Sequence, residues 1–386
     1  MRHVIILLFA VIIAFYVTPF LIDIFIMNQD SIDPSEQILT HKRGGLGVIT
    51  LNRLEALNAL SLEMIRQIAM ILKRWESDDE VSTVAFIGAG DRAFCAGGDL
   101  KSFYRAGMDY RRGQVDLSVP SLYFGEEYSL NKQIFHYPKP TIAIMDGVTM
   151  GGGYGIAGHC QYRFVTENTL FAMPEVAIGL FPDVGSVYHL LRAPNNWGRY
   201  LAITGVQIKA GDVLAAGLAD DYIQSGDVSA FLDGVASQGI ENVIGKFSSD
   251  KPKAIVFADH GDLIRDVFVG CDVLAMCSRL RENGLAWAME ILSVILSRAP
   301  ISVMVTAKHL EDMVGAEFDD VIAFDYTLAQ NFVGYPDLYE GIRAVLIDRQ
   351  HAPIWQPETL EDVRDEQVER FFKAGDKSLY EVKIFN

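Results

Sequence analysis

The amino-acid sequence predicts an α/β protein in which strands and helices alternate along the first half of the chain. Short segments rich in β-branched residues run into glycine-rich loops, and each loop leads to apolar residues at helical spacing. This unit recurs up to about residue 225, and such alternation is typical of an α/β core. From residue 226 onward the periodicity is helical and strand signals are few. We therefore expect an α/β core followed by a mainly helical extension.

The first unit begins with the strand GVITLNR, which starts at Gly47. Ser61 is suited to cap a helix, because its hydroxyl can accept a hydrogen bond from a free backbone N–H of the first turn. Apolar residues at helical spacing then predict one buried helix face, formed by Ile65, Ile68, Leu72 and Trp75. We expect further strands over residues 84–87, 141–145 and 163–165, and a helical run from Ile156.

The chain opens with a hydrophobic segment, residues 1–26. Nineteen consecutive residues, Val4 to Ile22, are uncharged, which is long enough to cross a bilayer. No small-residue cleavage site follows them. The segment is therefore either a membrane anchor or translated sequence upstream of a true start at Met27. The domains that we expect are this segment, a core over residues 36–225 and the helical extension over residues 226–386.

The composition argues against two classes of partner. The 386 residues carry a formal net charge of −17, whereas binding to a nucleic-acid backbone depends on clustered Lys and Arg. We therefore expect no nucleic-acid partner. The four cysteines form no CxxC pair, and the eight histidines form no HxxH or HxxxH pair, so we expect no metal site. The cysteines are interpreted as buried small side chains in a reducing compartment.

Two glycine-rich loops, residues 94–99 (FCAGGD) and 149–155 (TMGGGYG), each follow a strand end. Glycine lets a ligand approach the backbone closely and leaves N–H groups accessible. Two such N–H groups that converge on one point would form an oxyanion hole, which serves acyl-transfer chemistry. Two alternatives stay open. In the first, both loops are tight turns and have no further role. In the second, residues 153–158 bind a dinucleotide, because they fit GxGxxG and Glu175 follows about twenty residues later.

The segment MPEVAIGLFPDVG, residues 173–185, places two carboxylates in apolar surroundings. Glu175 and Asp183 are separated by seven residues, none of them polar. Ionised carboxylates in such surroundings are costly unless they are paired or hydrogen-bonded, so the two acids are candidates for a functional role. The alternative is that Asp183 only caps a local turn after Pro182.

Taken together, the motifs resemble the crotonase (enoyl-CoA hydratase/isomerase) superfamily, and within it the branch of 3-hydroxyisobutyryl-CoA hydrolases. The segments that carry the resemblance are LNRLEALNALS, AFCAGGDL, MDGVTMGGGYG, GEEYSLN, MPEVAIGLFPDVG and LYEGIRAVLIDRQHAPIWQP. The resemblance covers nearly the whole chain beyond the leader and is weakest over residues 226–300. It implies a crotonase-type ββα spiral core with a C-terminal helical extension.

The resemblance also implies roles for particular residues. The N–H groups of Gly98 and Gly152 would form the oxyanion hole, and Glu175 would be the catalytic carboxylate. Hydratases of the family carry a first catalytic glutamate where this chain has Gly155. Asp183 matches a position that is acidic in the hydrolases. A further group of residues would contact the substrate: Glu127, Gly152, Glu175 and Asp183 for the acyl part, and Ala56, Leu57, Asn58, Ala96, Gly98, Asp99 and Leu100 for CoA.

The function that the resemblance implies is hydrolysis of a short β-hydroxyacyl-CoA, 3-hydroxyisobutyryl-CoA of valine catabolism, without a metal or redox cofactor. The alternatives are an enoyl-CoA hydratase or isomerase and a non-catalytic acyl-CoA-binding protein. The chain departs from the hydrolase pattern at Ser186 and Val187, which would narrow the acyl pocket. The expected location is cytoplasmic, membrane-anchored if residues 1–26 belong to the mature protein, or the mitochondrial matrix if the source is eukaryotic. An oligomer is compatible with the family.

Overall fold

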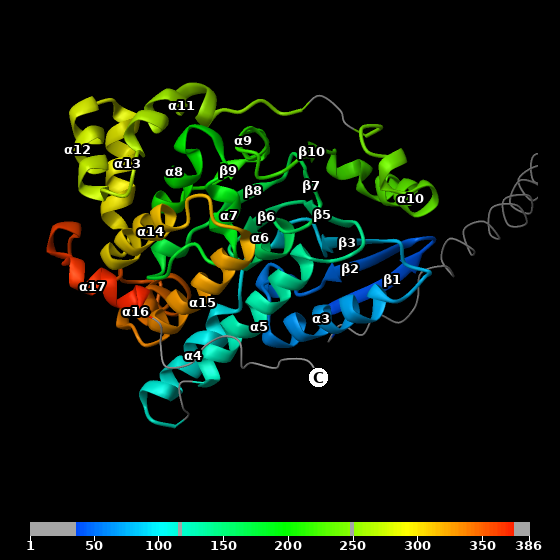
Figure 1. The fold of residues 1–386 in the computed structure, drawn as a ribbon, viewed down its shortest axis with the longest axis horizontal. Coiled ribbons are helices and arrows are strands. Elements are labelled where there is room, and N and C mark those ends of the chain that lie inside the picture. Colours follow the sequence, from blue (N-terminus) through cyan, green and yellow to red (C-terminus); the bar gives the residue numbers. More distant parts are fainter. Residues whose placement is uncertain (1–35, 115–117, 248–250, 374–386) are drawn as a thin grey trace, which may run out of the picture.

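The computed structural model describes residues 36–114, 118–247 and 251–373 (Figure 1). The hydrophobic segment over residues 1–26 lies outside these ranges, so its two interpretations stay predictions. Within the described ranges no single helix is long and apolar enough to cross a membrane. One bent pair of consecutive helices, Ala286–Ser297 and Pro300–Asp312, is together long and apolar enough by length and composition, with an angle of 107° between the two helices.

The larger sheet has six strands in the order β1-β2-β3-β5-β7-β10. Their bounds are β1 Ile38–Arg43, β2 Leu46–Leu51, β3 Thr83–Gly88, β5 Thr141–Met145, β7 Tyr162–Val165 and β10 Asp221–Tyr222. β1 and β2 form an antiparallel hairpin, and the other neighbours are parallel. The strands expected from Gly47 and over residues 84–87, 141–145 and 163–165 are thus present, with ends that differ by a few residues at most.

The smaller sheet carries the glycine loops. Its strands are β4 Ala93–Cys95, β6 Val148–Met150, β8 Leu170–Ala172 and β9 Ile208–Lys209, in the order β4-β6-β8-β9. β6 lies between β4 and β8 and pairs in parallel with both. Their carboxyl ends therefore meet at one edge of the sheet, the edge where open α/β sheets commonly bind ligands. The segments that begin at Ala96, Gly151 and Met173 leave the sheet at this edge.

Helices of the first half pack against the two sheets. They are α3 Leu62–Glu76, α4 Leu100–Arg111, α5 Ser118–Phe135, α6 Gly152–Ala157, α7 Ser186–Leu190, α8 Trp197–Thr204 and α9 Ala210–Ala215, with 3-10 turns at Leu54–Ala56, Glu175–Ala177 and Pro194–Asn196. The predicted cap of α3 is confirmed, because the Ser61 hydroxyl accepts a hydrogen bond from the Met64 N–H at 3.1 Å. The apolar stripe that was expected on α3 is buried.

The helix expected from Ile156 begins four residues earlier, at Gly152, and ends at Ala157. Glycine is a poor helix former, which is why the sequence favoured a loop here. Close packing decides otherwise, since a side chain at Gly153 would collide with the Cys95 carbonyl oxygen. The GxGxxG segment is buried within and just after this helix. It therefore offers no open backbone to a dinucleotide, and that alternative is wrong.

From Ser225 onward every described element is a helix. These are α10 Val228–Gln238, α11 Val256–Val267, α12 Val273–Asn283, α13 Ala286–Ser297, α14 Pro300–Asp312, α15 Phe318–Val333, α16 Pro336–Ile342 and α17 Asp365–Glu369, with short 3-10 or π turns at Ser225–Asp227, Ile240–Asn242, Arg343–Ile347, Leu360–Asp362 and Arg370–Phe372. The mainly helical character of the C-terminal part is thereby confirmed.

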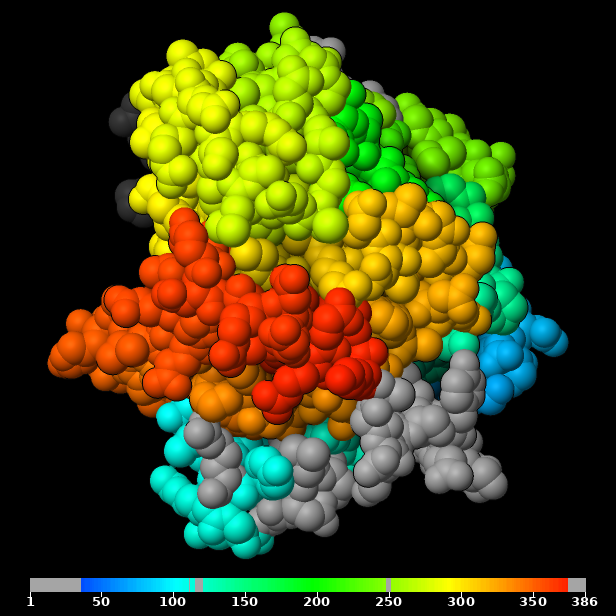
Figure 2. Space-filling model, turned by 60° about the vertical axis from the view of Figure 1, so that its left-hand side comes forward, coloured from blue at the N-terminus to red at the C-terminus, as the bar shows by residue number. Residues whose placement is uncertain are grey.

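Two apolar clusters use the two faces of the larger sheet. Side chains of β5 alternate between them, because successive residues of a strand point to opposite faces. Ile142 and Ile144 pack with α10 on one face, whereas Ala143 and Met145 belong to the main core. The main core continues into α15, which packs on α5, and α16, which packs on α4 (Figure 1). Figure 2 shows the C-terminal helices, in yellow to red, covering most of one face of the molecule.

Candidate active site

The two glycine loops meet at the edge of the smaller sheet. A Cβ placed on Gly152 would lie 3.4 Å from the Gly98 nitrogen, and one placed on Gly97 would lie 3.8 Å from the Gly152 nitrogen. Neither the Gly98 N–H nor the Gly152 N–H donates to an acceptor within the described ranges. Both glycines line the same cavity, which encloses about 530 Å³ with its open mouth. The loops are therefore more than separate tight turns, since they present two free donors to one space.

Glycine is required at these positions by space and by conformation. A side chain on Gly98 would approach the Tyr123 hydroxyl within 2.6 Å, and one on Gly152 would clash with Glu127 Oε1. Gly97 and Gly151 adopt φ values of +111° and +50°, which side chains strongly disfavour. Gly152 is also the first residue of α6, where backbone N–H groups have no partner within the helix.

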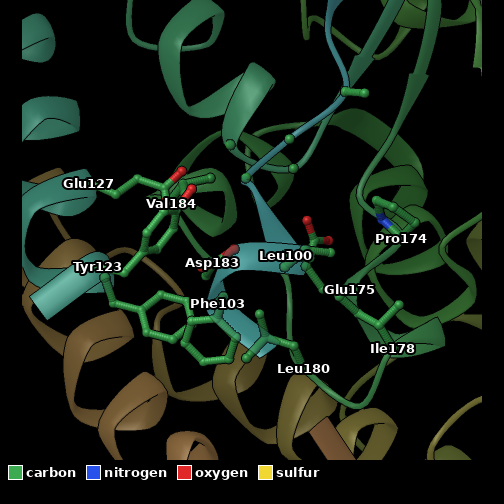
Figure 3. A pocket seen from close by; sticks show the side chains of 16 residues that line it. Leu100, Phe103, Tyr123, Glu127, Pro174, Glu175, Ile178, Leu180, Asp183 and Val184 are labelled. Carbon is green, nitrogen blue, oxygen red and sulfur yellow. The ribbon is translucent and has the colours of Figure 1, made fainter. Parts of the chain in front are cut away.

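Three carboxyl groups reach the cavity from different elements. Glu127 comes from α5, Glu175 opens the 3-10 turn after β8, and Asp183 lies in the turn before α7. Each is at most 5% exposed. Figure 3 shows Glu127 on one side of the cavity, Glu175 on the other and Asp183 between them. Glu127 Oε1 and Glu175 Oε2 are buried without a hydrogen-bond partner in the described part of the chain.

Burial raises the pKa of all three acids. Burial raises the pKa of Glu127 and of Glu175 well above the usual value, and the nearby Asp183 charge raises both further. Burial also raises the pKa of Asp183, to about 7, against the lowering effect of a hydrogen bond from Tyr128. Like charges this close in an apolar site resist ionising together. The three acids therefore do not readily ionise together.

The Asp183 side chain does not cap the local turn. Its Oδ2 accepts a hydrogen bond from the Tyr128 hydroxyl at 2.6 Å, and the following helix is capped by Gly185 without a side-chain bond. Asp183 contributes to the turn only through its backbone carbonyl, which accepts from the Ser186 N–H at 2.9 Å. The alternative that Asp183 only caps the local turn after Pro182 is therefore wrong.

Apolar side chains form the rest of the cavity wall. These include Leu100, Phe103, Ile178 and Leu180, and Figure 3 shows Phe103, Leu180 and Ile178 below Asp183 in this view. The helical extension supports this wall, since the ring of Tyr339 on α16 stacks on Phe103 with centroids 6.2 Å apart. The expected narrowing by Ser186 and Val187 does not occur, because these residues begin α7 and do not line the cavity.

Sequence reasoning missed Tyr123, Phe124 and Tyr128, which surround the acids. A usable signal was present for two of them. Tyr123 and Phe124 precede Glu127 by four and three residues, and residues at those spacings share one face of a helix. Tyr128 points to Asp183 across 55 residues of sequence, and no local pattern could have indicated that contact.

The expected CoA-binding residues divide into two groups. Ala96, Gly98 and Leu100 line the cavity, whereas Ala56, Leu57, Asn58 and Asp99 do not. The two segments are nevertheless adjacent, because the Ala96 N–H donates to the Leu57 carbonyl at 3.0 Å.

Two of these side chains are already engaged in structural contacts. The Asn58 amide donates to the Ala89 and Ala93 carbonyls. Asp99 caps α4 and pairs with Arg53 at 2.8 Å. The backbone is engaged as well, because the Asn58 N–H donates to the Arg53 carbonyl and the Asp99 N–H to the Leu60 carbonyl.

No group of three or more His, Cys, Asp or Glu within the described ranges is arranged to hold a metal ion. All four cysteines are free thiols. Cys95, Cys160 and Cys277 are buried, as expected, but Cys271 is exposed. The expectation that every cysteine is buried is therefore wrong for Cys271, which lies in a short segment between α11 and α12.

The fold and the paired glycine loops define an enzyme class that polarises acyl-CoA thioesters, and comparison with known proteins agrees. The family model described as enoyl-CoA hydratase/isomerase matches residues 46–372, and the chain belongs to this family, whose fold is the crotonase fold. The predicted family and fold class are thus confirmed.

Curated relatives narrow the resemblance. The mitochondrial 3-hydroxyisobutyryl-CoA hydrolase of Rattus norvegicus is 40% identical over 348 residues, which cover 88% of this chain and 89% of the relative. The Homo sapiens protein of the same name is 38% identical over 352 residues, which cover 89% of this chain and 90% of the relative.

Among solved structures, a carnitinyl-CoA dehydratase from Mycobacterium thermoresistibile is similar with a TM-score of 0.84 and 34% identity, covering 89% of this chain and 98% of that one. An enoyl-CoA hydratase from Rhodobacter sphaeroides is similar with a TM-score of 0.81 and 31% identity, covering 88% of this chain and 98% of that one.

Proposed function

We propose that this protein hydrolyses 3-hydroxyisobutyryl-CoA to 3-hydroxyisobutyrate and CoA. The curated relatives of that name, which match the chain over most of its length, support the substrate and the reaction. The observation that carries the proposal is one cavity that holds two unpaired backbone donors, from Gly98 and Gly152, together with Glu175. These relatives are named as mitochondrial, and the location of this protein would be the mitochondrial matrix if the source is eukaryotic.

In the proposed reaction, the thioester oxygen accepts hydrogen bonds from the Gly98 and Gly152 N–H groups. This stabilises the negative charge that develops on that oxygen when the carbonyl carbon is attacked. In one route Glu175 takes a proton from water as the water bonds to the carbon. The C–S bond then breaks, and the proton passes to the leaving thiolate.

In the other route the Glu175 carboxylate bonds to the carbonyl carbon and CoA leaves, giving a mixed anhydride that water then hydrolyses. Both routes require ionised Glu175. Asp183 would position the water or the acyl hydroxyl, and Glu127 would contact the acyl group. Neither route calls for a metal or redox cofactor.

Hydration is the competing function, and it is favoured by the similar solved structures, which are of a dehydratase and a hydratase. Family hydratases use a further glutamate at the position of Gly155. In this chain a Cβ at that position would lie 2.9 Å from Val184 Cβ and 3.0 Å from Asn131 Nδ2. No side chain fits there without rearrangement, which supports hydrolysis over hydration.

The proposal is tested by following free thiol with a chromogenic reagent over a panel of short acyl-CoA thioesters. We expect release from 3-hydroxyisobutyryl-CoA, with Glu175→Gln slower by at least ~100-fold, the usual weight of a general base. Hydration of crotonyl-CoA is measured in parallel. Faster hydration than thiol release would favour the hydratase, and binding without any turnover would favour a non-catalytic acyl-CoA-binding protein.

A further inference from the structure

The turn that carries Asp183 has an unfavourable backbone conformation. Val184 adopts a φ of +55° and Gly185 one of +72°. A left-handed conformation is a marked outlier for a β-branched residue such as valine. Strain of this kind persists only where surrounding contacts enforce it, and it is often found at functional sites. Val184 is buried and lines the cavity next to Asp183.

One contact that enforces this turn comes from His159, directly after α6. Its Nε2 lies 2.6 Å from the Val184 carbonyl oxygen. A carbonyl only accepts, so Nε2 carries the proton, and Nδ1 accepts from His189 Nε2 at 3.1 Å. This pattern needs a neutral ring, and burial lowers the pKa of His159 to about 4. His159 therefore acts as a hydrogen-bond donor of fixed orientation.

The second contact comes from the helical extension. Oδ2 of Asp325, on α15, accepts a hydrogen bond from the Gly185 N–H at 2.7 Å. Asp325 is fully buried, and its other oxygen lies 3.3 Å from Nε2 of the equally buried His309. Oδ2 can accept this bond whether or not the acid is protonated. The two contacts thus hold the C=O and the N–H of a single peptide group, the one between Val184 and Gly185, from separate elements.

We propose that His159 and Asp325 are positioning residues that hold Val184 in its left-handed conformation and thereby keep the Asp183 carboxyl group facing the acyl cavity. The expected effect on the reaction rate rests on the proposed function of Asp183, whereas the expected effect on the Val184 backbone conformation does not. Neither residue lines the cavity, so neither is expected to touch the substrate. Their effect on the reaction would pass through the turn alone.

The backbone consequence is tested by crystal structures of full-length variants. His159→Leu removes the donor and Asp325→Leu the acceptor, whereas His159→Gln and Asp325→Asn keep a group able to make each bond. We expect Val184 to leave the left-handed region in both leucine variants and to remain there in the conservative ones. Retention of the left-handed φ in both leucine variants would overturn the proposal. Thermal unfolding midpoints check that each protein is folded.

The catalytic consequence is tested by a double-mutant cycle on thiol release. We expect each leucine variant to lower kcat by at least ~10-fold, with KM changed by less than about threefold, because small misplacements of reacting groups are costly. The conservative variants should restore kcat to within about threefold of the parent. In the Asp183→Asn background the leucine substitutions should lower kcat by less than about threefold, since their effect passes through Asp183.

Losses of equal size in both backgrounds would contradict the positioning role. Absence of thiol release from the parent would instead refute the proposed function. The crystal structures would then decide the backbone proposal alone.

Discussion

At the scale of single residues, three buried carboxyl groups lie together in the cavity where the reaction is proposed to occur. Glu127, Glu175 and Asp183 share one cavity, and burial raises the pKa of each. Unpaired buried acids destabilise a fold once they ionise, so such a cluster is retained at a cost in stability. The same arrangement makes Glu175 a stronger base or nucleophile than a solvated glutamate.

The raised pKa values predict how activity depends on pH. Glu175 must be ionised to act, and its pKa lies above the ordinary value, so kcat/KM for thiol release should rise as pH increases from 5 to 8. A rate profile over this range measures the effect. A profile that is flat, or that falls with increasing pH, would show that ionised Glu175 is not the active form.

The same pKa shift predicts an effect on stability. Asp183 has a pKa of about 7 in the fold against 3.8 for an unperturbed aspartate, so the folded state binds the proton more tightly. Stability from this group is present at low pH and lost as pH rises from about 4 through 7. Asp183→Asn should therefore raise the unfolding midpoint by about 2 °C or more at pH 8, and by less at pH 5. Equal changes at both pH values would contradict this account.

At the scale of elements, helix α6 connects the two glycine loops to the sheet. Its first N–H belongs to Gly152, and Gly153 lies against the Cys95 carbonyl at the end of β4. This contact brings the loop after β6 against the loop after β4. The relative position of the two proposed oxyanion donors thus depends on a helix without a side chain at its second residue.

Gly153→Ala should therefore separate the loops. We expect a loss of stability of about 1–3 kcal/mol from overpacking, with thiol release slower by at least ~10-fold. Calorimetry and the thiol assay measure the two effects. Gly226→Ala is the matched control, because nothing lies within 4 Å of a Cβ at that position. Equal effects of the two substitutions would argue against a special role for the α6 contact.

The limits of sequence reasoning appear at this scale. The strands, the Ser61 cap, the glycine loops and the pair Glu175 and Asp183 were readable, since each depends on local periodicity or on a short motif. The start of α6 was misplaced, because helix propensity was overridden by packing against β4. The contact from Asp325 to Gly185 spans 140 residues, so nothing in either local sequence could indicate it.

At the scale of the whole molecule, the helical extension is part of the core. The main apolar cluster runs from the sheet through α15 and α16, and Asp325 joins the extension to the Asp183 turn. The boundary expected near residue 225 marks a change of secondary structure, and an independent unit on either side stays a prediction. The continuous core instead favours one cooperative unit.

Heat unfolding should accordingly show a single transition. Calorimetry and loss of thiol-releasing activity are expected to give the same midpoint, as for one cooperative unit. Limited proteolysis near residue 225 provides a second test. Two resolved calorimetric transitions, or a stable and active fragment over residues 36–225, would contradict the description of one shared core.

The most direct test of the central claim is a crystal structure with a ketone analogue of 3-hydroxyisobutyryl-CoA, in which a methylene group replaces the sulfur and hydrolysis cannot occur. The account predicts that the ketone oxygen lies about 3 Å from both the Gly98 and Gly152 nitrogens, with a Glu175 carboxyl oxygen near the carbonyl carbon. A ketone oxygen bound to neither nitrogen, or a Glu175 side chain on the far side of the acyl group, would contradict it.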